Sequence, residues 1–391
     1  MALWAEDWPE FRGPTGQGHA KATGIPTEWS ETQNVTWKVP VPGRGWSSPV
    51  VKDGRIWMTS SVDKGGGQSL RLLGYDLKSG KQLLDKEVVA LGDSPKQHKK
   101  NSYASPTPVL EGDMVYVHFG LVTAGVKTTG EVVWTQKMTY NWIHGNGGSP
   151  VLYKDLLIYS CDGADVQFVV GLDKRTGEVR WKTDRPKGGL MAFSTPLVIA
   201  TAKGDQVVSV GGHSAAAYDP LTGKELWVVQ YGDGFSNVPR PVYAHGLVYL
   251  CTGFYKPEVL AVRPDGTGDI TKTNVLWRVN RQVPLTPSPI IVDDLFYMVS
   301  DNGIFTALEA KTGRILYQER VGGNYSASPL YADGRLYLWN EEGEATVIAP
   351  GREFRVLAKN RVDGQTMATP AVAEKALIIR TDTSLYRIEK H

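Results

Sequence analysis

One short phrase recurs eight times along this chain and constrains its fold more than any other feature. A small polar residue, usually Ser or Thr, stands directly before a proline, and an apolar segment follows, as in Ser48-Pro49-Val50 and Thr369-Pro370-Ala371. Successive prolines of the phrase lie 40 to 59 residues apart, close to the length of one four-stranded propeller blade. The spacing therefore predicts a repeat protein in which each repeat is one blade.

Each repeat continues with the turns that a blade needs to reverse its strands. The later and sharper turn reads Asp173-Lys174-Arg175-Thr176-Gly177-Glu178 in the third repeat, and related turns begin at Asp76, Asp219 and Glu309. The acid can accept local backbone bonds while Gly takes a positive φ, so the chain enters its outermost strand. An aromatic residue stands four positions after the glycine in four copies, at Trp134, Trp181, Trp227 and Tyr317.

These turns resemble the repeat of the PQQ-like, or quinoprotein-like, β-propeller family over roughly Asn34 to His391. The resemblance implies that the Trp packs between adjacent blades and that the turn bonds the next blade's backbone. Repeats 1, 5, 7 and 8 depart from the phrase, with Leu84 in the Trp position of the first repeat. We therefore expect ordinary apolar packing at those seams.

The two ends of the chain predict how the ring closes. After Pro370 only three strands remain, near 369–373, 376–381 and 385–389, whereas residues 34–40 read like an isolated outer strand. Pairing of the two ends would leave no open sheet edge at the seam. The prediction is an all-β, eight-bladed β-propeller of four-stranded antiparallel blades, closed by the N-terminal strand. Residues 34–391 would form this single domain, with 1–33 as an N-terminal arm packed on it.

Charge and hydropathy exclude some functional classes. The net charge of +2, from 43 basic and 41 acidic residues, gives no field that favours nucleic acid or a membrane surface. No apolar stretch reaches the ~20 residues that a membrane helix needs. Residues 8–14 look like the mature start of secreted bacterial members of the family, so we expect a removed signal peptide and a periplasmic or secreted protein. A cytoplasmic protein with a natural Met1 is the alternative, and we expect a monomer in either case.

The cysteines bear on the cofactor. Cys161 and Cys251 fall in second strands of repeats 3 and 5, too far apart for a disulfide, and are expected to be buried small hydrophobes. Resemblance to quinoprotein dehydrogenases implies an adjacent cysteine pair over the quinone and a calcium site of Glu, Asn and Asp. No Cys-Cys pair occurs here. We therefore expect no cofactor and no dehydrogenase activity; PQQ and calcium stay open as alternatives that no ligand motif supports.

The loops that lead into the innermost strands are predicted to surround one mouth of the central channel. They are rich in side chains that suit sugar faces, planar heterocycles or extended peptides, because rings supply contact area and polar groups set orientation. The alternative is a structural role, in which the aromatic residues only fill the space around the propeller axis. The candidate ligand-binding residues are Arg44, Trp46, Lys100, Tyr103, His144, Asn146, Phe193, Arg240, Arg281, Tyr325 and Met367.

Histidines and acids near the same mouth are candidate metal-binding or catalytic groups. His98 and His144 precede inner strands of consecutive blades and could approach one another, with His213 as a third ligand, but no close ligand spacing supports a metal site. Asp162, Asp165 and the turns at Asp301 and Glu341 fit hairpin geometry without any catalytic role. No catalytic residue is assigned, and no metal is expected.

Three functions remain. The first is a non-catalytic, extracytoplasmic binding or scaffold protein that uses the loop-rich face, similar in blade number to the outer-membrane barrel assembly lipoprotein BamB, with a protein or carbohydrate partner. The second is a carbohydrate-active lyase or hydrolase using the region of His144, Arg240 and Tyr325. The third is a quinone-dependent oxidoreductase.

Overall fold

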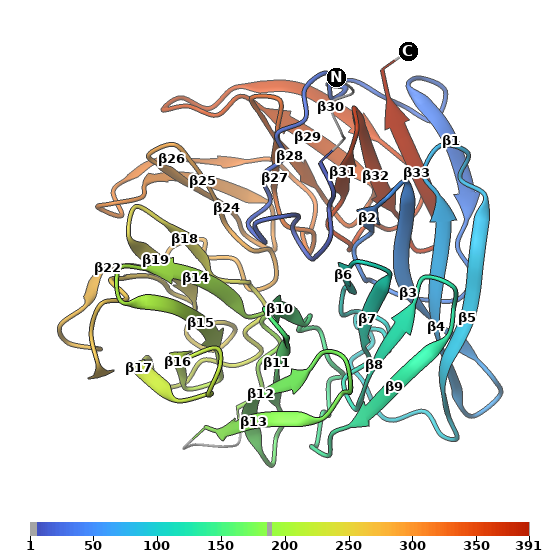
Figure 1. The fold of residues 1–391 in the computed structure, drawn as a ribbon. Helices are drawn as coiled ribbons and strands as arrows, with labels where there is room; N and C mark the ends of the chain where they lie inside the picture. The colour runs from blue at the N-terminus through green and yellow to red at the C-terminus, as the bar shows by residue number, and fades with distance from the viewer. Residues whose placement is uncertain (1–5, 186–189, 391) are drawn as a thin grey trace.

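The chain forms a ring of eight antiparallel sheets around one axis (Figure 1). This computed structural model describes residues 6–185 and 190–390. Within these residues the predicted eight-bladed β-propeller is confirmed, with seven sheets of four strands and one of five. Residues 1–5 of the predicted N-terminal arm lie outside the described residues.

The first four blades follow the order of the chain. Blade 1 contains β2 (Val50–Lys52), β3 (Arg55–Asp63), β4 (Gln68–Asp76) and β5 (Gln82–Leu91). Blade 2 contains β6 (Val109–Glu111), β7 (Met114–His118), β8 (Val122–Lys127) and β9 (Val132–Lys137). Blade 3 contains β10 (Val151–Tyr153), β11 (Leu156–Asp162), β12 (Gln167–Asp173) and β13 (Val179–Asp184). Blade 4 contains β14 (Leu197–Thr201), β15 (Gly204–Val210), β16 (Ser214–Tyr218) and β17 (Glu225–Gln230).

The remaining blades complete the ring. Blade 5 contains β18 (Val242–Ala244), β19 (Leu247–Cys251), β20 (Val259–Val262) and β22 (Val275–Val279). Blade 6 contains β23 (Ile290–Val292), β24 (Leu295–Val299), β25 (Ile304–Glu309) and β26 (Ile315–Arg320). Blade 7 contains β27 (Leu330–Ala332), β28 (Arg335–Trp339), β29 (Glu344–Ile348) and β30 (Val356–Arg361). Blade 8 contains β31 (Ala371–Ala373), β32 (Ala376–Arg380), β33 (Ser384–Glu389) and the N-terminal β1 (Val35–Pro40).

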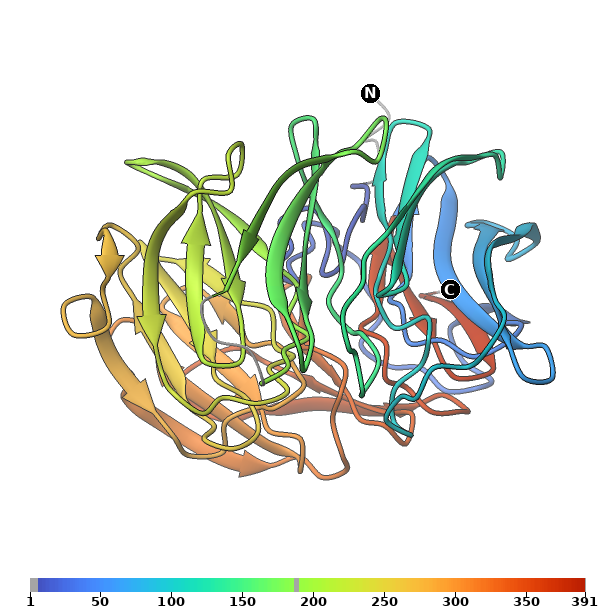
Figure 2. The ribbon, with the colours of Figure 1, turned by 90° about the horizontal axis from the view of Figure 1, so that it is seen from below.

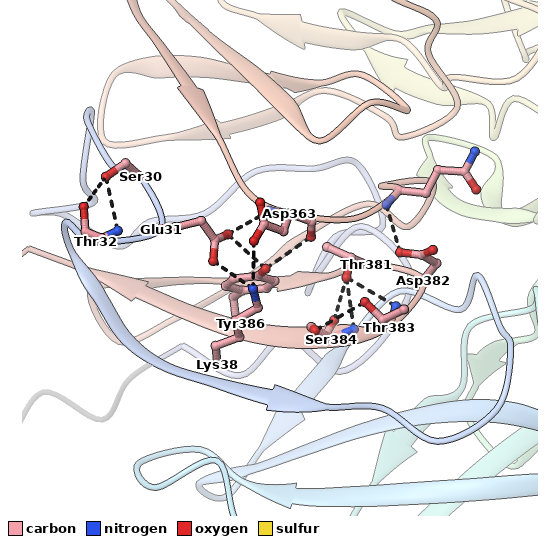
Figure 3. A network of polar contacts seen from close by, with 11 residues as sticks. Ser30, Glu31, Thr32, Lys38, Asp363, Thr381, Asp382, Thr383, Ser384 and Tyr386 are labelled. Carbon is pink, nitrogen blue, oxygen red and sulfur yellow. Dashed lines mark hydrogen bonds and ion pairs between the residues drawn. The ribbon is translucent and has the colours of Figure 1, made fainter.

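The predicted closure by the two ends of the chain is confirmed. β1 pairs antiparallel with β33, and Lys38 lies opposite Tyr386. Beside this pair, Glu31 accepts a bond from Lys38 Nζ at 2.8 Å and one from the Tyr386 hydroxyl at 3.0 Å, while Asp363 holds the same lysine (Figure 3). We call these four residues the closure cluster. It ties the segment before β1 to blades 7 and 8.

The core lies between the blades. Second and third strands are buried on both faces because each blade is covered by two neighbours, as the continuous burial of β12 and β24 shows. Outer strands such as β1 instead alternate between partly buried and exposed residues, as expected of a strand with one wet face. Burial of these apolar faces against the next blade is what holds the ring together.

A tryptophan of one blade is fastened to the turn of the next. The Trp134 indole N–H donates to the Lys174 carbonyl at 3.0 Å, and its ring covers Gly177, where a Cβ would lie 2.5 Å from the indole. The Gly177 φ is +76°, a conformation that glycine adopts freely. Trp181 repeats the arrangement with Pro220 and Gly223. Each fastening therefore needs a Trp in one blade and a Gly turn in the following one.

The pairing of a Trp with the Gly turn of the next blade corrects the prediction of which seams lack this contact. Blade 5 was expected to lack the fastening, yet Trp277 donates to the Ala310 carbonyl at 3.0 Å and covers Gly313. Its own irregular turn is irrelevant because blade 6 supplies the glycine. Blade 8 is fastened in the same way by Trp37, which covers Gly80 of blade 1. At the seam from blade 1 to blade 2, Leu84 covers Gly130 by apolar contact, as predicted.

A different contact, a pairing of strands, holds the seam between blades 4 and 5. Trp227 belongs to a complete phrase, but its indole donates to Gln206 of its own sheet at 2.8 Å. Blade 5 instead sends out β21 (Gly268–Asp269), which pairs in parallel with β17 as a fifth strand of blade 4. The inserted segment replaces the missing glycine turn.

The N-terminal arm enters the ring near its axis. Trp8 bridges to Val51 of β2, Leu110 of β6 donates to the Pro9 carbonyl, and His19 bridges to Tyr331 of β27. Figures 1 and 2 show this blue segment inside the ring, among the inner strands. In residues 6–185 and 190–390, no helix is long and apolar enough to cross a bilayer.

Candidate functional site

A circle of seven hydroxyl side chains surrounds the channel. They are the residues directly before the proline of the recurring phrase, and each is at least 97% buried. We call them the axial hydroxyl ring: Ser48, Thr107, Ser149, Thr195, Ser288, Ser328 and Thr369.

The ring links neighbouring blades through backbone bonds. The N–H of Ser48 donates to Thr107 Oγ1 at 2.9 Å, and the N–H of Thr107 donates to Ser149 Oγ at 2.9 Å. The same bond recurs around the axis, except from blade 4 to blade 5, until the N–H of Thr369 donates to Ser48 Oγ at 3.1 Å. The following proline favours an extended backbone at each donor residue. The phrase therefore satisfies inner-strand N–H groups that have no partner within their own sheet.

Arg240 takes the place of the hydroxyl in blade 5. Its N–H still donates to Ser288 Oγ at 2.9 Å, but its side chain turns toward the N-terminal arm. The guanidinium donates to the Pro196 carbonyl at 3.0 Å and to the Phe11 carbonyl at 2.6 Å, and lies 3.5 Å from the Glu10 carboxylate. Arg240 therefore anchors the arm in the channel.

A cavity of about 620 Å³ opens beside the axial hydroxyl ring, and all seven hydroxyl residues line it. Its wall on the side of blades 1 to 5 is aromatic. The His144 ring lies 6.5 Å from Phe193 and 5.7 Å from Phe235, and Phe235 stacks on Tyr255 at 4.7 Å. We call the following residues the aromatic wall: Trp46, His98, His144, Phe193, Phe235 and Phe254.

An ion pair bridges distant parts of the cavity mouth. Lys100 Nζ, from the loop before blade 2, lies 2.5 Å from Glu341 Oε1 of blade 7. Glu341 also accepts a bond from the Ser326 hydroxyl at 2.6 Å. Blades 2 and 7 are not neighbours, so this pair connects loops across the mouth.

The Asp301 carboxylate, which lines the cavity, accepts hydrogen bonds from the backbone. Its Oδ2 accepts bonds from the N–H groups of Leu285 at 2.6 Å and Thr286 at 3.2 Å. Burial raises the pKa of Asp301, and these bonds counteract part of that rise. Asp162, the other buried acid predicted near the mouth, pairs with Arg185 at 2.7 Å, with both side chains almost fully buried. Both acids therefore hold loops in place.

The two mouth histidines lie side by side, as predicted. The His98 and His144 rings are 5.8 Å apart, and the backbone N–H of His98 donates to the backbone carbonyl of His144. Burial, and then the neighbouring His98, lower the pKa of His144, so this imidazole is neutral at pH 7. His213 is not brought to them and instead bonds the Gly232 carbonyl at 3.0 Å. Among the described residues, no group of three His, Cys, Asp or Glu side chains could hold a metal ion.

Five of the predicted candidates line the cavity. They are Trp46, Lys100, His144, Phe193 and Met367. Arg44 lies beside them, its guanidinium 5.6 Å from the Trp46 ring, while Arg281 is exposed and does not line the cavity.

The remaining candidates have structural contacts elsewhere. The Tyr103 hydroxyl donates to the Pro95 carbonyl, and Asn146 Oδ1 accepts from the N–H groups of the two glycines that follow it. Tyr325 is 1% exposed in the core of blades 6 and 7. Because Arg240 is bound to the arm, the proposed catalytic grouping of His144, Arg240 and Tyr325 does not exist.

Sequence reasoning missed two parts of this site. The axial hydroxyl ring was visible as the recurring phrase, but its role as a set of inter-blade acceptors was not inferred. The arm residues Phe11 and Arg12 were also missed: Phe11 lines the cavity, and the fully buried Arg12 donates to the Pro289 carbonyl at 2.7 Å. Nothing in the local sequence of the arm indicates that it enters a channel.

The residues present do not fit the quinone and calcium of the dehydrogenases. Cys161 and Cys251 are buried in blades 3 and 5, as predicted, and neither lines the cavity. Calcium prefers six to eight oxygen ligands. The cavity instead presents Lys100, two histidines and Asp301, whose carboxylate already accepts backbone bonds.

Comparisons of the sequence with a family model and with known proteins agree on one family. The sequence model of a family described as outer membrane protein assembly factor BamB matches residues 90–270 and 259–353. The chain is 21% identical over 340 residues to the outer membrane protein assembly factor BamB of Legionella pneumophila (strain Paris), covering 74% of this chain and 84% of that one. It is 30% identical over 95 residues to that of Burkholderia pseudomallei (strain K96243), covering 24% of each chain.

Two solved structures show the same fold. The crystal structure of BamB from Moraxella catarrhalis superposes with a TM-score of 0.64 at 13% identity, covering 91% of this chain and 98% of that one. A europium-containing methanol dehydrogenase superposes with a TM-score of 0.70 at 11% identity, covering 97% of this chain and 90% of that one. The fold is therefore shared by an assembly factor and by an enzyme, and it does not decide between them.

Proposed function

The chain belongs to the PQQ-like β-propeller family described by the BamB model, and from this premise we propose that it is a non-catalytic, extracytoplasmic binding protein. Its partner would be a protein engaged in outer membrane protein assembly, the role that the names of its relatives state. The binding surface would be the cavity mouth and the aromatic wall. We propose that it acts as a monomer.

The observation that carries this proposal is the aromatic wall and its continuation onto the surface. Phe254 and Tyr255 are 59% and 61% exposed, and Tyr255 stacks on Phe235 of the cavity. Exposed aromatic side chains that continue a pocket are typical of protein-binding sites. The acids of the cavity, in contrast, are bound to Lys100 or to backbone N–H groups, which supports binding in preference to acid–base catalysis.

The test is complementation in the source bacterium. A strain without the gene would receive wild type, a Phe235→Ala/Tyr255→Ala variant, or Leu83→Ala as a matched control. Leu83 is also an exposed apolar residue, at 47%, but lies on the outer strand β5. We expect wild type and Leu83→Ala to restore the amount of folded outer membrane proteins, and the double variant to fail at equal protein level.

Two results would contradict the proposal. One is a double variant that complements as well as wild type. The other is product release from a glycan by the purified protein, which would favour the carbohydrate-active alternative. In that case His144→Ala, which removes the imidazole beside Phe193 and Phe235, should abolish the release.

A further inference from the structure

The innermost strand of each blade turns one backbone edge toward the channel axis. In an antiparallel pair, alternate residues direct their N–H and C=O groups away from the partner strand. In blade 1 this residue is Val51, which stands three positions after Ser48 and exchanges two bonds of 2.8 Å with Trp8 of the N-terminal arm. The same register recurs in the other seven blades, so each inner strand has such a residue.

The N-terminal arm bonds this edge in four blades of the described chain. Besides Val51, the N–H groups of Leu110 and Tyr331 each donate to an arm carbonyl at 2.8 Å. The N–H of Tyr243 donates to the side-chain oxygen of Gln17 at 2.6 Å. An extended polypeptide paired with the inner strands is therefore a contact that this fold already makes.

Blades 3 and 4 leave the same edge without a partner. Leu152 and Val198 hold the position of Val51, are partly exposed, and have no hydrogen bond beyond their own sheets within residues 6–185 and 190–390. In blades 6 and 8 the equivalent residues, Ile291 and Val372, are 8% and 3% exposed, so their edges are closed to a partner. The accessible part of the inner edge is thus confined to two adjacent blades.

β14 of blade 4 offers the longer of these two edges. It has five residues, whereas each other inner strand has three. Counted from Val198, the alternation of an antiparallel strand directs the N–H and C=O of Ala200 to the same side, and Ala200 is exposed. Two residues of one strand therefore present four free backbone groups, a pattern that accepts an added strand.

A second cavity, of about 430 Å³, lies against this edge and is lined by residues 197–200. It differs from the cavity of the aromatic wall, which is lined by Thr195 from the segment before β14. The arm runs between the two cavities, because Phe11 borders the first and Pro14 the second. The volume is within the range of roughly 300–1,000 Å³ that is typical of binding pockets.

The wall of the second cavity favours small, uncharged side chains. Its charged residues among those described, Glu10 and Arg240, lie 3.5 Å from each other, and most of the remaining wall is apolar. Where the arm itself pairs with an inner strand, the residues that bond Tyr331 are Gly18 and Ala20. Small residues let a backbone approach the strand edge inside the narrow channel.

We propose that the free edge of β14 binds an extended segment of a partner protein, which adds to blade 4 as a further inner strand and carries small, uncharged side chains. The arm provides the precedent for this contact within the same channel. The inference goes beyond the proposed function, because it places a second binding site away from the aromatic wall.

Residue-resolved hydrogen exchange by NMR on the full chain tests the pairing. The probes are the acetylated and amidated peptide Ala-Val-Ala-Thr-Ala and the same peptide methylated at every backbone nitrogen, which keeps the side chains but blocks strand pairing. We expect the first peptide at saturation to slow exchange of the Val198 and Ala200 amides at least about tenfold, since a bonded amide exchanges only after local opening. The methylated peptide should not slow them. The Val51 amide, already bonded to Trp8, is the internal control.

A variant pair assigns the binding to β14. Ala200→Pro removes one N–H that points away from the sheet, a position at which a strand edge tolerates proline, whereas Ala200→Ser keeps this N–H. We expect Ala200→Pro to lower the affinity for the unmethylated peptide roughly two- to tenfold, and Ala200→Ser to bind like wild type. If Ala200→Pro does not fold, the comparison of the two peptides on wild type still decides.

Three results would overturn the inference. One is an equal effect, or no effect, of the two peptides on both amides. The second is slow exchange of both amides in dilute protein alone, which would show that the chain itself covers the edge. The third is slowing that grows with protein concentration, which would identify a second copy as the occupant. The Phe235→Ala/Tyr255→Ala variant should bind the peptide like wild type, so the peptide experiment and the complementation experiment fail independently.

Discussion

The backbone N–H of Thr369 in blade 8 donates to Ser48 Oγ of blade 1 at 3.1 Å, and this bond joins the last repeat to the first. It is equivalent to the bonds between other blades, so the axial hydroxyl ring closes the propeller on the inside. Outside, β1 closes it through its pairing with β33. Two independent devices thus hold the same seam.

Ser48→Ala should destabilise the protein by about 1–3 kcal/mol, because the buried Thr369 N–H loses its acceptor. The midpoint of urea unfolding measures the change. Ser30→Ala is the control, since the Ser30 hydroxyl bonds Thr32 within its own turn at the surface. Equal midpoints for the two variants would show that the ring bond does not contribute to stability.

Gly177→Ala should be more destabilising than Gly54→Ala. Both glycines have φ near +70°, at +76° and +71°, so both variants strain the backbone by roughly 1–2 kcal/mol. Only at Gly177 does the new Cβ meet the Trp134 indole, 2.5 Å away, whereas Gly54 has no atom within 4 Å. The collision adds about 1–3 kcal/mol. Equal losses in urea unfolding would contradict the role of the Trp fastening.

The closure cluster should make stability depend on acid pH. Burial alone would raise the pKa of Glu31, but the bonds from Lys38, the Asp363 N–H and Tyr386 bring it below the usual 4.5. A carboxylate whose pKa is lower in the folded state stabilises above its unfolded pKa, and this stabilisation is lost as pH falls through the folded value.

The difference in unfolding midpoint between wild type and Glu31→Gln should therefore be full at pH 7 and shrink below about pH 4.5. Glu178→Gln, at an exposed position in a blade turn, is the control and should show a smaller difference at pH 7. A Glu31→Gln difference that stays constant from pH 7 to pH 3 would be inconsistent with the cluster.

His98→Gln should raise the pKa of His144. Burial is the main cause of the lowered pKa, and the neighbouring His98 is the second, so removing that imidazole leaves only burial. NMR titration of the His144 ring measures the shift. His245→Gln is the control, because His245 bonds the Asp293 carbonyl in a turn after β18. An unchanged or lowered pKa in His98→Gln would refute the coupling.

The repeat, the number of blades and the closing strand could all be predicted from the sequence. These features are local: each phrase of Ser or Thr before proline marks one inner strand, and an unpaired outer strand near Trp37 reads as such without reference to its partner. The Trp seams were predicted less well. Whether the indole of Trp277 or of Trp227 bonds the neighbouring blade depends on the turn of that next blade. The sequence of a single repeat therefore does not predict the contact at its own seam.

Only the tertiary structure decided which side chains share the axis. Trp46, His144 and Phe193 were found because their loops converge in any propeller, but Arg240 and Tyr325 stand at similar sequence positions and turn away. Arg12 reaches the channel through the fold of the arm, and Lys100 meets Glu341 across non-adjacent blades. Such contacts join residues hundreds of positions apart through the curvature of the ring, and no local pattern encodes that distance.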